Sequence, residues 1–381
     1  MKDLEFDIGL KMPNFSHLDT SLRSRFKEIT QIPQNPCINQ NYDSDEYLSE
    51  LINQLKIKSL VVGVGGAGNN IVTRLQELGL PFTETLNVNT DAHDLYFSNS
   101  KHKLLIGKDN CNGLGSGNDP LMGEIAAKED IDRLRNNLNA DIVFITCGLG
   151  GGTGTGAASV IAKEAKKNGA ITVSFCTIPF RSEGIQRRMR AKVGLKKLAK
   201  YSDTLIPIPN DNLLEILPNQ SILFCFKIMD EVLVRSIREI ANLINNCGMI
   251  NIDFADVRKT FQKSSQYPSG LIGISETLGD SNDLIYKSKL AIHNPLLKEL
   301  NSKDVDRCLV SVSSDHKLSL SNVDKIVSTI SNEVPDRAKI KFGANLDPNL
   351  DTKIRIMVLG KGPISPYVRS AVDSDIEDYS E

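Results

Sequence analysis

The chain has 381 residues, 40% hydrophobic and 24% charged, which is ample for one large or two ordinary domains with buried cores. A formal charge of −2 and 6% aromatic residues without Trp argue against nucleic-acid binding, because no basic field and few stacking platforms are available. Seven scattered cysteines without a CxxC pair indicate reduced thiols rather than a disulfide framework or a zinc site. Without a signal-peptide pattern or a long apolar run, we expect a cytoplasmic protein with no membrane span.

The first 56 residues are predicted to be an N-terminal extension, partly disordered and with short helices. Residues 1–43 are polar, but apolar residues recur at helical spacing from Phe15 to Ile29. This pattern is typical of a weak surface helix, and a docking site for a partner or a membrane is the alternative. A second helix is predicted to begin after Asp43, where a capping-box pattern occurs.

Residues 57–218 are predicted to form a mainly parallel α/β domain. Short apolar runs alternate with helical patterns, and near-continuous apolar strands are typical of a parallel sheet that is covered on both faces. The predicted strands are 60–64, 85–88, 104–106, 142–146, 171–177 and 205–208. The predicted helices are 70–78, 120–138, 157–168 and 186–200.

A long central helix is predicted over 219–248, because apolar residues recur every three or four positions and Gly248 supplies a C-terminal stop. Residues 249–362 are predicted to form a smaller α+β domain. Its predicted strands are 271–274, 308–312, 340–343 and 354–359. The last two strands alternate polar and apolar residues, which suggests a solvated sheet edge. The acidic residues 363–381 are predicted to be a short disordered tail.

Two glycine-rich loops each follow a predicted strand and precede a predicted helix. The first is Gly63-Val-Gly-Gly-Ala-Gly-Asn-Asn70. Small residues let the backbone approach phosphate oxygens, and a helix N-terminus adds its positive dipole end. Alone, this loop also matches the dinucleotide fingerprint, and Asp91 has near the spacing of a ribose contact. An NAD(P)-dependent oxidoreductase is therefore one alternative.

The second loop is Gly148-Leu-Gly-Gly-Gly-Thr-Gly-Thr-Gly156. Its consecutive glycines make a nest of N–H groups with two hydroxyls beside them. Neither loop is a P-loop, because no GKS or GKT sequence follows. A nucleoside triphosphate held between two helix N-termini accounts for both loops, whereas a dinucleotide leaves the second unexplained. The small-residue loop at 113–120 is expected near the terminal phosphate.

The order of these motifs resembles the FtsZ branch of the tubulin/FtsZ GTPase family, and the composition is compatible with an archaeal member. The motifs, in family order over roughly 58–362, are GVGGAGNN, NVNTDA, GLGSGNDP, GLGGGTGTG, PFRSEG, IPNDNLL and NIDFADVR. The resemblance implies the tubulin/FtsZ fold, with a Rossmann-like GTPase domain, a long central helix and a smaller C-terminal α+β domain. It also implies a GTP-dependent, self-assembling protein of the cell-division ring.

The resemblance also implies roles for individual residues. Those expected to hold the phosphates are Gly66, Ala67, Gly68, Asn69, Asn70, Gly152, Thr153 and Gly154. Glu183 and Arg187 correspond to the family's sugar-contacting pair, and Phe226 and Asp230 occupy the positions that face the base. Chemistry independently supports Asp230, because a carboxylate can accept both N1–H and N2–H of guanine, a pair of donors that adenine lacks.

Asn251, Asp253 and Asp256 match the family's loop that activates the hydrolytic water. The expected ligands are GTP and GDP, with Mg²⁺ bound mainly through phosphate oxygens and no metal site built from side chains. A non-hydrolysing GTP-binding scaffold or regulatory paralogue is the main alternative. The paired acids argue against it, because a site that no longer hydrolyses GTP does not need them.

The acids are expected to serve a neighbouring subunit. Asp230 and Gly248 lie 18 positions apart on the central helix, which corresponds to about 27 Å. The acids beyond Gly248 would therefore not reach their own nucleotide, whereas a head-to-tail stack brings them to the next subunit, and such contacts generate filaments. The expected partners are further copies of the chain and unknown membrane-tethering or division proteins, with the protein concentrated at the division site.

Overall fold

The structure is a computed structural model, and it describes residues 57–79, 83–245, 249–315, 318–347, 350 and 353–374. The predicted N-terminal extension, Gly248 and the end of the tail at 375–381 lie outside the described residues. Within the described part of the chain, no helix combines the length and the apolar character that a membrane crossing requires.

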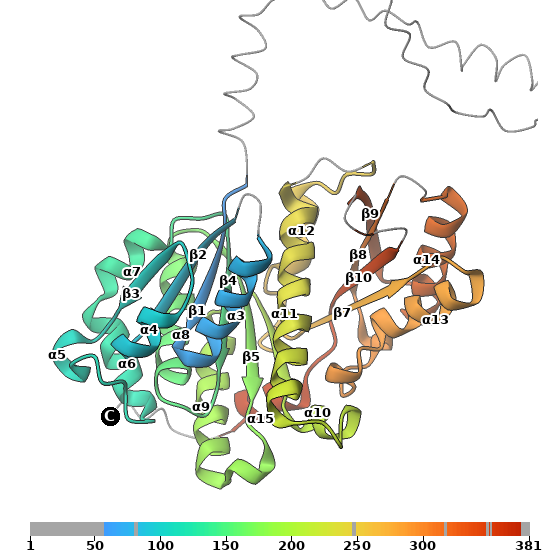
Figure 1. Cartoon of the computed structure of the whole chain (residues 1–381). Coiled ribbons are helices and arrows are strands. Elements are labelled where there is room, and N and C mark those ends of the chain that lie inside the picture. Colours follow the sequence, from blue (N-terminus) through green and yellow to red (C-terminus); the bar gives the residue numbers. More distant parts are fainter. Residues whose placement is uncertain are drawn as a thin grey trace, which may run out of the picture. The chain divides into compact units, whose positions relative to one another are not determined.

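Six parallel strands form the first sheet, in the order β3-β2-β1-β4-β5-β6 (Figure 1). Its central strands are buried along nearly their whole length, which is why their sequences are continuous apolar runs. The strands are β1 (Ser59–Val64), β2 (Thr83–Asn89), β3 (His102–Leu105), β4 (Ile142–Gly148), β5 (Ile171–Ile178) and β6 (Thr204–Pro209). The predicted parallel α/β domain is confirmed.

Helices cover both faces of this sheet. One apolar core packs α3 (Gly65–Leu78) and α11 (Ile222–Asn245) against it and continues into the second sheet, and another core lies under α6, α7, α8 and α9. The helices of the domain are α4 (Ala92–Phe97), α5 (Lys108–Cys111), α6 (Pro120–Glu129), α7 (Ile131–Asn137), α8 (Thr153–Lys167), α9 (Ile185–Tyr201) and α10 (Asp211–Ile216).

The helix boundaries differ from the predicted ones in two ways. Helices α3 and α8 begin inside the glycine-rich loops, whose first turns carry no periodic apolar signal. The single helix predicted over 120–138 is broken at Asp130. The Asp130 carboxylate accepts the Gly107 N–H at 2.9 Å and pairs with Arg133 at 2.5 Å, so it ties the break to the loop before α5.

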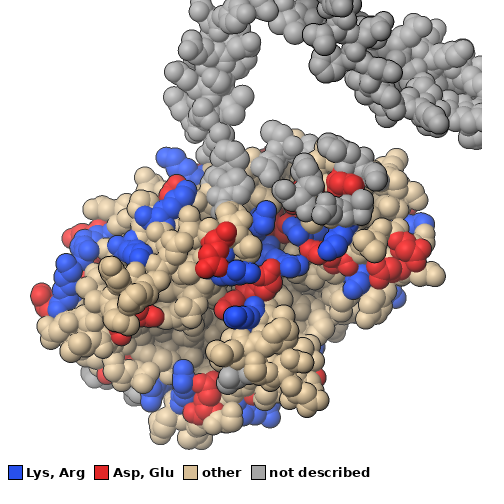
Figure 2. Space-filling view, in the orientation of Figure 1, with Lys and Arg blue, Asp and Glu red and all other residues tan. Residues whose placement is uncertain are grey.

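Helix α11 lies between the two sheets (Figure 1). The second sheet has the order β7-β10-β8-β9, in which β10 is antiparallel to both neighbours and β8 is parallel to β9. The elements of this smaller domain are α12 (Phe254–Phe261), β7 (Gly270–Thr277), α13 (Ser281–Ile292), β8 (Arg307–Ser314), α14 (Leu320–Glu333), β9 (Lys339–Leu346) and β10 (Ile354–Lys361). The predicted α+β fold is confirmed. Basic and acidic side chains are intermixed on the face in Figure 2, in keeping with the small net charge.

Two details of the predicted C-terminal region are wrong. Strand β10, predicted to alternate as part of a solvated edge, lies second in the sheet and is buried along nearly its whole length, and its Arg355 donates to the buried Glu239 carboxylate instead of facing water. The edge strand with exposed lysines is β9. The tail predicted to be disordered over 363–381 begins with a helix, α15 (Pro366–Val372). Val368 and Ala371, three positions apart, are buried where α15 packs on α9.

Candidate nucleotide-binding site

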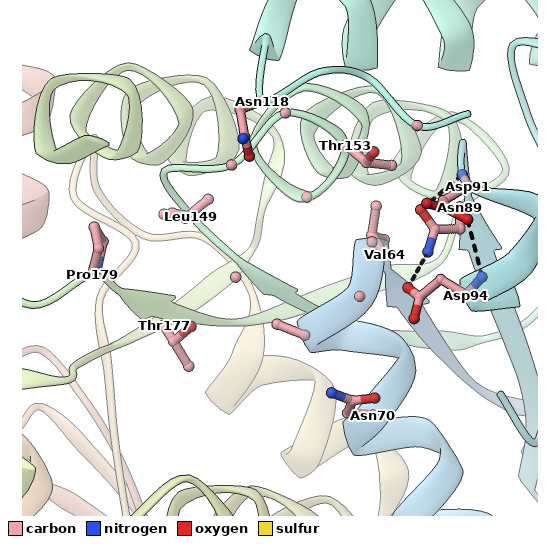
Figure 3. Close-up of a pocket in the computed structure, with 18 of the residues that line it drawn as sticks. Val64, Asn70, Asn89, Asp91, Asp94, Asn118, Leu149, Thr153, Thr177 and Pro179 are labelled. Atoms are coloured by element: carbon pink, nitrogen blue, oxygen red, sulfur yellow. Dashed lines mark hydrogen bonds between the residues drawn. The ribbon is translucent and has the colours of Figure 1, made fainter. Parts of the chain in front are cut away.

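A cavity of about 780 Å³ opens at the carboxyl ends of the first sheet's strands, where open parallel sheets bind ligands. In Figure 3, Val64 reaches it from the end of β1 and Asn70 from α3, and Leu149 and Thr153 reach it from the β4–α8 turn. Thr177, at the end of β5, lies along the wall. The two predicted glycine-rich loops therefore line one cavity.

The first loop is shaped for close approach of the backbone. Gly65 has a φ of +69°, which L side chains rarely adopt, and it opens α3. Gly66, Ala67 and Asn70, which were predicted to hold the phosphates, line the cavity. Because α3 begins here, the free N–H groups of its first turn are directed at the same space.

The second loop combines a helix N-terminus with paired hydroxyls. Gly152, Thr153 and Gly154 line the cavity, and α8 begins at Thr153. The Thr153 hydroxyl lies 2.6 Å from that of Thr90 and 3.1 Å from that of Ser116. These contacts join the loop to the ends of two neighbouring segments, so the glycine-rich turn is held in one shape that can receive an anion.

The predicted sugar and base contacts lie at the other side of the cavity. Arg187 forms an ion pair with Glu183 at 2.9 Å, and Glu183 also accepts the Phe180 N–H at 2.8 Å. The Phe226 ring lies 6.0 Å from the Phe180 ring, centroid to centroid. Asp230 follows one helical turn later on α11, and burial raises the pKa of its carboxyl to about 6. All four predicted residues line the cavity.

Gly68 and Asn69 were predicted to hold phosphate, but they are not among the residues that line the cavity. A Cβ on Gly68 would lie 2.2 Å from the Thr146 carbonyl oxygen, so this glycine lets α3 pack on β4. The Asn69 side chain is 1% exposed, and neither polar atom has a hydrogen-bond partner among the described residues. Sequence spacing alone does not separate glycines that face a ligand from those that face a strand.

The cavity also includes residues that were not predicted as site residues. Asp91 accepts the N–H groups of His93 and Asp94 and so caps α4, while Asn89 donates to Asp94 at 2.7 Å (Figure 3). Other lining residues of this kind are Thr90, Ser116, Asn118, Asn210 and Lys227. Most of them lie in the NVNTDA, GLGSGNDP and IPNDNLL motifs, so they could have been predicted as site residues from these motifs.

The predicted catalytic acids lie elsewhere. Asn251, Asp253 and Asp256 do not line the cavity. Asp253 caps α12 by accepting the Ala255 N–H at 3.1 Å, and Asp256 pairs with Lys341 at 3.2 Å. In Figure 1, α12 lies near one end of α11, and α10, which follows the cavity residue Asn210, lies near the other.

A nucleoside triphosphate fits the side chains and backbone groups that are present. The volume is in the range of ligand sites. Two helix N-termini face one end, where phosphates would lie, and a carboxylate with an aromatic neighbour occupies the other, where a base would lie. No lysine follows either glycine loop, so the backbone N–H groups would supply most of the phosphate contacts.

Comparison with known proteins agrees with this geometry. Residues 58–218 match the Tubulin/FtsZ family, GTPase domain, and residues 269–362 match the FtsZ family, C-terminal domain. The chain is 43% identical to cell division protein FtsZ of Methanothermobacter thermautotrophicus over 94% of this chain and 93% of that protein. It is 42% identical to cell division protein FtsZ 1 of Pyrococcus furiosus over 91% of this chain and 90% of that protein.

Among solved structures, an empty FtsZ dimer of M. jannaschii matches with a TM-score of 0.76 and 39% identity, covering 84% of this chain and 92% of that chain. These matches confirm the resemblance in the motifs and leave no place for the oxidoreductase alternative. The chain therefore belongs to the tubulin/FtsZ family of GTPases.

Proposed function

We propose that this chain is a self-assembling GTPase of cell division, and that it hydrolyses GTP only where two copies stack head to tail. The relatives' names, cell division protein FtsZ and FtsZ dimer, support division and self-association as the process. The proposal that two copies share one catalytic site rests on the position of the acids. The cavity and the Asp253–Asp256 segment lie toward opposite ends of α11.

The distance along α11 is too long for one subunit to complete its own site. Asp230 lines the cavity, and the helix continues for 15 residues to Asn245, which corresponds to about 22 Å. The acids follow beyond that end. A side chain reaches only a few ångströms, so a neighbouring copy must bring its acids to the cavity.

Exposed apolar side chains at both ends support such a stack. Leu114 and Leu223, which line the cavity, are 85% and 71% exposed. Met249, just before the acids, is 54% exposed. A contact between these two different surfaces would bury all three side chains, and repetition of a heterologous contact builds a filament.

In this proposal the neighbour's acids act on the attacking water. Asp253 and Asp256 accept hydrogen bonds from the water and orient it, and Asn251 positions it. The water oxygen forms a bond to the γ-phosphorus while the bond from phosphorus to the bridging oxygen breaks. The N–H groups at the starts of α3 and α8 offset the charge on the phosphate oxygens. Mg²⁺, bound mainly through phosphate oxygens, would neutralise further charge.

A mixing experiment tests the shared site. The first variant, Asp256→Ala, keeps its cavity and loses an acid. The second, Gly151→Leu, keeps its acids and fills the cavity, since a Cβ at Gly151 meets nothing closer than Asn118 Oδ1 at 4.0 Å. Each variant alone should hydrolyse little GTP. In an equal mixture, random stacking pairs an intact cavity with intact acids at about a quarter of the contacts, and turnover should recover to about that fraction.

Pelleting must show that both variants enter the same filaments. No recovery in a verified copolymer would mean that each chain uses its own acids, which contradicts the proposal. Undiminished turnover by Asp256→Ala alone would contradict the role of the acid. A wild-type chain that binds GTP and assembles without turnover would instead indicate the scaffold alternative.

The same proposal places the protein in the cytoplasm, concentrated at the division site through an unknown membrane-tethering or division protein. A fluorescent fusion expressed at native level should form a band at mid-cell in dividing cells. A uniform signal throughout division would argue against this location, and it would leave the GTPase proposal to be decided by the mixing experiment.

A further inference from the structure

One lysine is buried where the smaller domain meets the first sheet. Lys361, the last residue of β10, is 5% exposed. Its ammonium donates to the carbonyl oxygen of Asp203, just before β6, at 2.6 Å and to the hydroxyl oxygen of Thr204, the first residue of β6, at 2.9 Å. The third acceptor is the carbonyl oxygen of Phe261, at 3.3 Å. Lysines are rarely buried unless they are paired, and here three N–H groups meet three oxygens.

Phe261 is the last residue of α12, the helix that carries the predicted catalytic acids at its other end. The last carbonyl groups of a helix have no partners within it, and a cation near them is favourable. Besides Lys361, the Thr204 hydroxyl donates to the Phe261 carbonyl at 2.6 Å. Arg307, which is opposite Lys361 on β8, donates to the Lys259 carbonyl. These contacts hold the C-terminal end of α12 against β6, β8 and β10.

The charged groups around Lys361 are mostly basic. Burial lowers the pKa of Lys361 to about 7, and Lys263, Lys166 and Arg307 act in the same direction, while Asp203 opposes them. Below pH 7 the ammonium form predominates, and only this form has three N–H groups for the three oxygens. Burying the ammonium costs free energy, and its three hydrogen bonds offset this cost.

Apolar packing defines the position of α12 less well than these hydrogen bonds do. Val257 and Phe261 are fully buried, so they turn one face of the helix inward. Apolar contacts are non-directional, whereas hydrogen bonds at the C-terminal end fix the tilt of the helix. Asp253 lies eight residues from Phe261, about 12 Å along the helix. A tilt of about 5° at Phe261 moves Asp253 by about 1 Å, and a misplacement of about this size can cost about a hundredfold in rate.

We propose that Lys361 is a positioning residue for GTP hydrolysis, and that it sets where the acids of α12 stand when they meet a neighbouring copy. The inference rests on the proposed function, in which Asp253 and Asp256 complete the site of the next subunit. Lys361 is not among the described residues that line the nucleotide cavity, and it acts through the Phe261 carbonyl. Its loss should therefore weaken the acids that a subunit offers to its neighbour, and leave its own cavity intact.

Lys361→Met tests the role, because it keeps the length of the side chain and removes the three N–H groups. In filaments with saturating GTP at about pH 6.5, where the ammonium form predominates in the wild type, we expect kcat to fall by about fivefold. GTP affinity of the monomer should stay unchanged. Lys166→Met is the matched control, because the Lys166 ammonium lies 2.7 Å from the carboxylate of Asp203 and so binds the same residue through a different group. Its kcat should equal that of the wild type.

Mixed filaments show which end of the chain is affected. Strand β6 leads to the cavity residue Asn210, so an effect on the chain's own cavity has to be separated from an effect on the acids. In an equal mixture with Gly151→Leu, about half of the Lys361→Met cavities receive intact acids, and turnover should reach about 30% of wild type. In an equal mixture with Asp256→Ala, every working cavity depends on acids from Lys361→Met chains, and turnover should reach about 10%. The first mixture should therefore exceed the second by about threefold.

Equal turnover in the two mixtures, or the reverse order, would overturn the proposal, because the effect would then not follow the acids. Unchanged kcat in Lys361→Met filaments would overturn it as well. The equal mixture of Gly151→Leu and Asp256→Ala distinguishes this failure from failure of the proposed function. If that mixture recovers no turnover, the shared site is wrong and the role of Lys361 with it, whereas recovery there with the reverse order refutes the role of Lys361 alone.

A second variant covers the case in which Lys361→Met does not fold. Thr204→Val removes the hydroxyl that accepts from Lys361 and donates to the Phe261 carbonyl, and it replaces a buried side chain with one of similar shape. We expect a smaller fall in kcat with the same order of the two mixtures. Unchanged kcat in well-folded Thr204→Val filaments would contradict the role of these hydrogen bonds at the end of α12.

Discussion

Arg355 on β10 donates to the Glu239 carboxylate on α11, with 2.6 Å between Nη1 and Oε1. Both side chains are largely buried, at 13% and 2% exposure. Arg355 also pairs with Glu276 on β7 at 2.9 Å, and Glu276 accepts from Arg235 at 3.1 Å. Charged pairs therefore join the central helix to the second sheet at a buried junction, where apolar packing would be expected.

We expect Arg355→Leu to destabilise the protein strongly, because it leaves the Glu239 carboxylate buried without its cation. Breaking such a pair from one side costs about 3–5 kcal/mol. The free energy of unfolding in urea measures the loss. Arg337→Ala is the matched control, because Arg337 pairs with Asp306 at 3.9 Å and both side chains are well exposed. Its cost should be below about 1 kcal/mol. Equal costs for the two variants would contradict the importance of the buried pair.

GTP affinity should depend on pH through Asp230. Burial raises the pKa of this carboxyl from 3.8 to about 6, so the ligand-free protein holds a proton there below pH 6. Only the carboxylate can accept both N1–H and N2–H of guanine, so affinity should rise as pH increases through 6 and level off above it. Titration calorimetry at pH 5 to 7, in buffers of different ionisation enthalpy, should show proton release on binding.

The same raised pKa gives the stability of the ligand-free protein the opposite dependence on pH. Because the folded pKa lies above the unfolded value, the neutral form of Asp230 is favoured in the fold, and its contribution to stability is lost as pH rises from about 4 to beyond 6. Asp230→Asn is the control, since an amide does not titrate there. Binding by Asp230→Asn with an unchanged pH profile around 6 would show that another group is responsible.

Two glycines should respond differently to alanine. A Cβ at Gly68 would lie 2.2 Å from the Thr146 carbonyl oxygen, which is part of the backbone and has no rotamer to change. Gly68→Ala should therefore cost about 1–3 kcal/mol of stability by overpacking. Gly151→Ala meets nothing closer than 4.0 Å and should leave stability nearly unchanged. Thermal unfolding of the two ligand-free variants checks this, and equal melting temperatures would contradict the packing role of Gly68.

The parallel sheet could be predicted because its strands are buried on both faces and appear as continuous apolar runs. The nucleotide site could be predicted because the glycine-rich loops occupy the strand-to-helix turns, which meet at one edge of a parallel sheet. The starts of α3 at Gly65 and of α8 at Thr153 could not be predicted, because glycines carry no periodic pattern and become helical only where the fold holds them.

The remaining differences arise from contacts between distant parts of the chain. Arg355 interrupts an apolar strand, and its partner Glu239 lies 116 positions away, so nothing local indicates that the arginine is buried. Helix α15 is short and lies in an acidic region, and it is held by contacts with distant residues, which include its packing on α9. Whether Gly68 faces the ligand or packs on β4 depends on how α3 is rotated about its axis, and the local sequence does not specify this rotation.

Lys341 should tune hydrolysis without affecting nucleotide binding. Its ammonium lies 3.2 Å from the Asp256 carboxylate, at the end of α11 away from the cavity. If Asp256 orients the water in a neighbour's site, Lys341→Met removes the group that holds this carboxylate in place, and a carboxylate with more rotamers orients water less well. We expect kcat for GTP to fall by about two- to tenfold in filaments, while GTP affinity of the monomer stays the same. Lys339→Met, on the same face of the edge strand, is the matched control and should leave kcat unchanged. A fall in monomer GTP affinity in Lys341→Met would indicate that the two ends of α11 are coupled within one subunit, and equal kcat values for the two variants would remove Lys341 from the site.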